Sequence, residues 1–390
     1  MQKPIYLDYH ATTPVDRRVL DVMLPYFLDC FGNPASSTHQ FGWKAQEGVE
    51  EARRRLAALI GAAAREIIFT SGATESNTLA IRGCTDPPGG GRNEIVTSAI
   101  EHKSVLETCR RLAQAGWKVT HLPIAADGRV NLEAAREAIT SRTLLVTVMF
   151  ANNEIGTLQP IAELSQLAHA HGALLHTDAA QAAGKVPVDV DALGIDLLSM
   201  TAHKMYGPKG CGALYVRRKL ELCPMIEGGG QERGVRAGTL NVPGIVGFGE
   251  AARICREEMA EEAARTARLR ARLLEGLQQL GGIRVNGSLE HRLPQNLHVS
   301  FEHVESEELI VGIGDIAVSA GSACQSGKGG MSHVLQALHG AGAPHAAAVR
   351  FGLGRFTTEE EIDYTVDKFS AVVRHLRPSG QSLQPAQERS

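Results

Sequence analysis

Short apolar segments alternate with amphipathic stretches between residues 94 and 216. The segments predict buried strands at 94–98, 118–122, 143–150, 174–177, 196–200 and 213–216, with an earlier strand from residue 67. Strands that alternate with helices form βα units, and such units place ligand-binding groups at the carboxyl ends of parallel strands. The pattern therefore predicts an α/β fold built around a mostly parallel sheet.

The C-terminal third of the chain has a different pattern. A long helical stretch at 251–280 is followed by strands expected at 296–301 and 316–318 and by helices expected at 306–313, 332–338 and 359–376. We expect a large domain over 16–255 and a smaller α+β domain over 256–376. The polar, proline-containing tail at 377–390 is expected to be disordered.

Composition excludes several classes of protein. A formal net charge of −3 over 390 residues argues against a nucleic-acid or membrane-surface role. The seven cysteines are odd in number and lack tandem CxxC spacing, which favours a reducing compartment over a disulfide framework or a zinc site. Neither a membrane span nor a signal sequence is evident. We expect a cytoplasmic protein, or an organelle protein without its transit peptide.

Three predicted strand ends carry groups that suit one cofactor. Lys204 follows the strand at 196–200, and burial there lowers the pKa of an amine and makes it nucleophilic, although an isolated lysine more often reaches solvent. Asp178 ends the strand at 174–177. Gly72 lies in a turn before a helix start, where backbone N–H groups bind anions. An amine, a carboxylate and an anion site together indicate pyridoxal phosphate (PLP).

Motifs along nearly the whole chain resemble those of the cysteine desulfurases. These enzymes belong to the class-V aminotransferase family and supply sulfur for iron–sulfur cluster assembly, including the nitrogen-fixation type. The matches include Thr-Ser-Gly-Ala-Thr-Glu-Ser at 70–76, His-Thr-Asp-Ala-Ala-Gln at 176–181 and Gly-Ser-Ala-Cys at 321–324, with others at 6–14, 32–34, 101–102, 152–156, 203–204, 228–234, 237–239 and 350–356. The resemblance implies PLP-dependent transferase fold type I with a seven-stranded sheet, and it assigns residues 1–15 to the small domain.

The resemblance also implies roles around the cofactor. Lys204 would form the Schiff base, Asp178 would pair with the pyridine nitrogen, and His102 would stack on the ring and transfer protons. The phosphate would be held by Ala73, Thr74, Thr201 and His203. Asn153 and Gln181 would contact the ring 3′-oxygen, and Asn153 alternatively the substrate. Thr239 would reach the phosphate of the partner subunit's cofactor, which implies a homodimer with shared sites.

Two further residues would determine the reaction. Cys324 lies in a glycine-rich segment near Lys328, which suits a reactive thiolate. By resemblance it would take the sulfur of L-cysteine as a persulfide, release L-alanine and pass the sulfur to a scaffold protein. No resident metal is expected, although Cys324 could contact a transferred iron–sulfur cluster. Arg350 would bind the substrate carboxylate with Asn33 and Asn153, and Arg355 is the alternative anchor.

Other functions are compatible with parts of this pattern. A selenocysteine lyase or another PLP-dependent C–S lyase would share the fold, but simple β-elimination requires no protein thiol such as Cys324. A non-catalytic scaffold would have no need of Lys204, Asp178, His102 and Cys324 together. The basic run at 53–55 is expected to be a solvated helix face.

Overall fold

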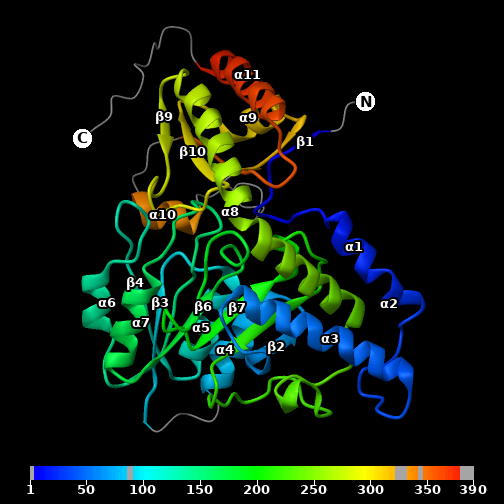
Figure 1. The fold of residues 1–390 in the computed structure, drawn as a ribbon. Coiled ribbons are helices and arrows are strands. Elements are labelled where there is room, and N and C mark those ends of the chain that lie inside the picture. Colours follow the sequence, from blue (N-terminus) through cyan, green and yellow to red (C-terminus); the bar gives the residue numbers. More distant parts are fainter. Residues whose placement is uncertain (1–3, 86–90, 321–331, 341–345, 378–390) are drawn as a thin grey trace.

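The computed structural model describes residues 4–85, 91–320, 332–340 and 346–377 (Figure 1). Cys324 and the tail at 378–390 lie outside these described residues, so their predicted roles are not addressed by the fold. Among the described residues, no helix combines the length and apolarity that crossing a bilayer requires.

The larger part of the molecule contains a seven-stranded sheet, as predicted. The order is β2-β8-β7-β6-β5-β3-β4, and only β8 runs antiparallel to its neighbours. The strands are β2 (Ile67–Thr70), β3 (Glu94–Ser98), β4 (Lys118–Leu122), β5 (Thr143–Thr147), β6 (Leu174–Asp178), β7 (Leu197–Thr201) and β8 (Gly212–Val216). The mostly parallel sheet confirms the predicted fold class.

Helices cover both faces of this sheet because successive strand residues point to opposite sides. Leu145 packs in the cluster on one face, and Val146 packs in the larger cluster on the other. The first face is covered by α4 (Ala73–Thr85) and α5 (Lys103–Gln114), and the second by α1 (Arg17–Met23), α3 (Gln40–Leu59), α6 (Leu132–Ala138), α7 (Ile161–Ala170) and part of α8 (Val242–Gln278). Strands buried on both sides explain the continuous apolar segments in the sequence.

A second hydrophobic core lies around a smaller antiparallel sheet with the order β12-β13-β10-β9. Figure 1 shows two of its strands, β9 and β10, beside α8. The distal half of α8 contributes Leu269, Leu273 and Leu277 to this core, and Leu7 joins it from the N-terminal arm. The remaining elements are α2 (Pro25–Leu28), β9 (Ile283–Val285), β10 (Asn296–Glu302), α9 (Ser306–Gly312), β12 (Ser319–Ala320), α10 (His333–His339), β13 (Ala346–Gly352), α11 (Glu359–Leu376) and the parallel pair β1 (Ile5–Tyr6) and β11 (Ile316–Ala317). The domain boundaries at 16–255 and 256–376 stay predictions.

Two predicted element boundaries differ from the observed ones by more than two residues, for identifiable reasons. The helix expected from residue 251 begins at Val242, and glycines in its first turns obscured the apolar pattern. These glycines allow close packing, since a Cβ atom added at Gly249 would lie 2.4 Å from Cα of Ala52 in α3. The strand expected at 143–150 ends at Thr147, although the apolar residues beyond it remain buried.

The prediction of a solvated face at 53–55 is wrong for Arg53. Its side chain is 8% exposed and forms a bidentate ion pair with Glu232, whose side chain is 1% exposed. Arg53 points toward the sheet, where its guanidinium also donates to the carbonyl of Ile67. Arg54 keeps the exposed position that the pattern predicted.

Candidate active site

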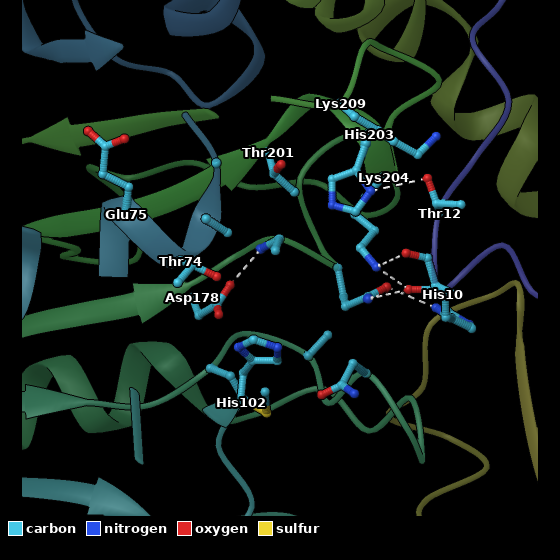
Figure 2. Close-up of a pocket in the computed structure, with 18 of the residues that line it drawn as sticks. His10, Thr12, Thr74, Glu75, His102, Asp178, Thr201, His203, Lys204 and Lys209 are labelled. Carbon is cyan, nitrogen blue, oxygen red and sulfur yellow. Dashed lines mark hydrogen bonds between the residues drawn. The ribbon is translucent and has the colours of Figure 1, made fainter. Parts of the chain in front are cut away.

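A cavity of about 640 Å³ opens at the carboxyl ends of β6 and β7 (Figure 2). The parallel register pairs Asp178 with Ser199, which brings the ends of these strands side by side. The cavity collects most of the predicted site residues, namely Ala73, Thr74, His102, Asn153, Asp178, Gln181, Thr201, His203, Lys204 and Arg350.

Lys204 lies in a short 3-10 turn directly after β7. Its Nζ donates to the backbone carbonyl of His10, and to that of Ala11 at 2.6 Å (Figure 2). Burial, followed by the nearby charge of Arg350, lowers the pKa of the Lys204 amine to about 8. A substantial neutral fraction is therefore available near physiological pH, as a nucleophilic amine requires.

Asp178 is the last residue of β6 and is 6% exposed. Its Oδ2 accepts from the side-chain amide of Asn77 at 2.7 Å, and its Oδ1 accepts from the backbone N–H of Ala180 at 2.9 Å. One protein donor on each oxygen fixes the plane of the carboxylate and leaves lone pairs for a cationic N–H group in the cavity.

A candidate anion site lies at the start of α4, where Ala73 and Thr74 offer first-turn N–H groups that have no acceptor within the helix. Gly212 of β8 lies close behind this turn, because a Cβ atom there would be 2.5 Å from Cα of Gly72. Thr201 and His203 face the same cavity. Burial and the charge of Lys204 lower the pKa of His203 to about 4, so its ring is neutral at physiological pH.

His102 precedes α5 and caps it, because its Nδ1 accepts from the backbone N–H of Ser104 at 3.2 Å. The imidazole extends into the same cavity as Asp178 (Figure 2). The cap fixes the orientation of the His102 ring in the cavity.

Arg350, in β13, supplies a cation at another side of the cavity. Its Nη2 donates to Oδ1 of Asp8 and to Oγ of Ser319, both at 2.8 Å, and its Nη1 donates to the carbonyl of Asn153 at 3.0 Å. Its Nε is buried without a hydrogen-bond partner in the described part of the chain. Arg350 therefore retains donor capacity for a carboxylate.

Arg355 is a weaker candidate than Arg350 for binding a substrate carboxylate. Its guanidinium pairs with Asp16 at 2.7 Å and with Glu262 at 3.0 Å, and it stacks over the ring of Tyr206. None of these contacts faces the cavity, so the structure favours Arg350.

Asn33 and Thr239 are not brought to this cavity within one chain. Both line a separate cavity of about 500 Å³ beside the Arg53–Glu232 ion pair. The side chain of Asn33 accepts from the backbone N–H of Ala35 at 3.0 Å. Asn33 and Arg350 therefore line different cavities of one chain, and the assistance of Asn33 to Arg350 stays a prediction.

Comparisons with known proteins agree with this arrangement. The model of the family "Aminotransferase class-V" matches residues 5–365. The chain belongs to the class-V aminotransferase family. A relative from Anaeromyxobacter sp. (strain Fw109-5), named cysteine desulfurase IscS, is 53% identical, and the match covers 97% of this chain and 94% of that protein.

Solved structures of similar proteins have the same fold as this class-V aminotransferase. A NifS-like protein is 38% identical with a TM-score of 0.89, and the match covers 96% of this chain and 100% of that one. A structure of SspA in complex with cysteine is also 38% identical, with a TM-score of 0.80 and coverage of 91% and 100%.

Several polar residues of this class-V aminotransferase were missed by sequence reasoning. His10 is buried, its Nδ1 donates to Oε1 of Gln181 at 2.9 Å, and its Nε2 accepts from Asn296 at 3.1 Å. Burial lowers the pKa of His10 to about 3, so the ring is neutral. Gln181 also donates to the carbonyl of His10, which leaves its amide one further N–H. Only the motif at 6–14 signalled this contribution of the N-terminal arm.

Proposed function

We propose that the chain is a PLP-dependent cysteine desulfurase that converts L-cysteine to L-alanine and donates the sulfur to iron–sulfur cluster assembly. The single observation that carries the proposal is the convergence of Lys204, Asp178 and Arg350 on one cavity. An amine of lowered pKa, a carboxylate and a guanidinium match the three groups that a PLP enzyme needs for its cofactor and an amino acid.

The donor set fits the cofactor. Lys204 would hold it covalently, Asp178 would accept from its pyridine N–H, and Ala73, Thr74, Thr201 and His203 would surround its phosphate. The close approach of Gly212 to Gly72 supports this fit, because a larger side chain would fill the space behind the phosphate turn. When bound, PLP serves as an electron sink for the substrate's α-carbon. Asp178 would favour this by keeping the ring nitrogen protonated.

Arg350 would bind the α-carboxylate of cysteine and so fix which substituents face Lys204. Arg350 is 8% exposed and already pairs with Asp8, and its unpartnered Nε–H would favour a substrate carboxylate over an amide because charge-assisted hydrogen bonds are stronger than neutral ones. The neutral amine of Lys204 would accept the α-proton, and His102 would exchange protons with the sulfur side of the substrate.

Cys324 would perform the sulfur transfer. Its thiolate attacks Sγ of the substrate, an S–S bond forms, and the substrate C–S bond breaks with its electron pair staying on the substrate. Protonation of that carbon yields L-alanine, and Cys324 retains the persulfide. An acceptor such as an iron–sulfur scaffold protein, in the cytoplasm, would then receive the sulfur.

A homodimer would complete the second cavity. Thr239 lines that cavity away from Lys204, as expected for a residue that serves a partner's site, and Asn33 lines the same cavity. Exposed apolar side chains on the neighbouring surface support such an interface, with Phe27 at 56%, Leu28 at 75% and Phe31 at 65% exposed. Phe31 also contacts Phe41 with ring centroids 5.3 Å apart.

Product analysis tests the proposal. The purified protein is incubated anaerobically with L-cysteine and a thiol reductant, and sulfide, alanine, pyruvate and ammonia are quantified. The proposal predicts equal amounts of sulfide and alanine from the wild type, and neither product from the Lys204→Ala variant. Pyruvate and ammonia in place of alanine would identify an eliminating lyase instead.

A further inference from the structure

Asn77, on α4, links two groups of the site through one side-chain amide. It is fully buried, and its Nδ2 donates one hydrogen to Oδ2 of Asp178 at 2.7 Å and the other to Oγ of Ser104 at 2.9 Å. The orientation of the amide is fixed because an ionised Asp178 only accepts hydrogen bonds. A flipped amide would place Oδ1 of Asn77 against Oδ2 of Asp178, and two acceptors would then face each other.

The hydrogen-bond direction continues from Ser104 to His102. Because Asn77 donates to Oγ of Ser104, it cannot accept the hydroxyl proton of Ser104. Nδ1 of His102 accepts the backbone N–H of Ser104 and so carries a lone pair, to which Oγ donates at 2.8 Å. Two donors on Nδ1 require it to carry a lone pair, so the proton of the neutral imidazole lies on Nε2.

We propose that Asn77 is a positioning residue that orients Asp178 and, through Ser104, keeps the neutral ring of His102 as a hydrogen-bond donor at Nε2. The inference rests on the proposed function, in which Asp178 pairs with the cofactor's pyridine nitrogen and His102 faces the substrate. The amide of Asn77 then sets the orientation of both Asp178 and His102, the two groups proposed to contact the cofactor ring. In its neutral form His102 presents an N–H to the cavity, so it donates a hydrogen bond there and has no lone pair at Nε2.

The test uses the holoenzyme with ¹⁵N-histidine and a cofactor labelled with ¹⁵N in its pyridine ring. NMR is recorded for the wild type, Asn77→Leu, Ser104→Ala and His102→Gln, the last of which assigns the His102 signals by their loss. The wild type should show His102 protonated at Nε2. Asn77→Leu should shift two signals, that of the pyridine nitrogen and that of Nδ1 of His102. Ser104→Ala should shift only the Nδ1 signal of His102.

Kinetics provide a second readout that a purely structural role would not reproduce. Asn77→Leu should lower kcat about ten- to a hundredfold, the loss expected for a hydrogen bond to a charged group, while KM for cysteine changes less than about twofold because Arg350 is untouched. Asn77→Asp has nearly the same volume and lacks the amide donor, so it should also shift the pyridine signal if the leucine variant does not fold.

Two results would overturn the inference: a wild-type His102 protonated mainly at Nδ1, or an unshifted pyridine nitrogen in folded variants of Asn77. A wild-type protein that binds no labelled cofactor would contradict the proposed function itself, and this inference with it.

Discussion

Replacing Glu232 by glutamine tests whether the buried ion pair with Arg53 stabilises the fold. Glu232 Oε2 accepts from Nη1 of Arg53 at 2.8 Å and from the backbone N–H of Phe69 at 2.7 Å, and its Oε1 accepts from Nη2 of Arg53 at 2.8 Å. Glutamine has the same shape but one amide group in place of an oxygen. In either orientation, a donor of residue 232 would face a donor of Arg53 or Phe69.

The expected cost follows from the burial of both partners. Breaking a buried pair while leaving the other charge in place costs about 3–5 kcal/mol. Both side chains are less than 10% exposed, so solvent does not rescue Arg53. At an unfolding entropy of about 2.1 cal/mol/K per residue, a chain of this length loses about 5 °C in Tm for ~4 kcal/mol. Glu232 and Arg233 also have positive φ angles of 46° and 59°, so the pair additionally holds a strained turn.

Thermal unfolding followed by circular dichroism measures this effect. Glu107→Gln is the matched control, because Glu107 forms a similar pair with Arg110 at 2.8 Å but both side chains are more than half exposed. The control should shift Tm by less than about 1 °C, as exposed pairs contribute about 0–1 kcal/mol. If Glu232→Gln unfolds at the control's temperature, the ion pair does not stabilise the fold as argued.

The remaining predictions concern the active site. Burial lowers the pKa of Lys204 from 10.5 to about 8, so its amine loses its charge as the pH rises through about 8. Amine-selective labelling of Lys204 in the apoprotein, mapped by mass spectrometry, should therefore be half-maximal near pH 8. Labelling that rises only near pH 10 would contradict this. Lys204→Ala should abolish the near-visible cofactor band, and a retained, borohydride-reducible band would refute the assignment. Arg350→Lys should raise KM for cysteine about ten- to a hundredfold, because lysine lacks the unpartnered Nε–H that Arg350 offers to a carboxylate. The exposed control Arg272→Lys should leave KM unchanged, and steady-state kinetics measure both.

Much of the fold could be predicted because its signals are local. Strands buried on both faces appear as continuous apolar segments, and Asp178 and Lys204 stand where such segments end. The parallel arrangement then places both residues at one edge of the sheet. Sequence order and strand direction therefore suffice to bring these two groups into one cavity.

The features that escaped prediction depend on distant partners. Whether Arg53 faces solvent or the sheet depends on Glu232, which lies 179 positions away along the chain. Asn77 resembles any polar helix residue until α4, α5 and β6 are packed together. Asn33 was expected to assist Arg350, and the folded chain places it with Thr239 in another cavity.

The proposed sulfur transfer is tested most directly by peptide mapping after reaction with L-cysteine. The holoenzyme is mixed with L-cysteine without reductant, digested, and analysed by mass spectrometry, with Cys324→Ser as the control. The proposal predicts one added sulfur on the Cys324 peptide and alanine in the supernatant, and neither sulfur addition at position 324 nor sulfide release in the control. An unmodified Cys324 accompanied by pyruvate and ammonia would contradict it.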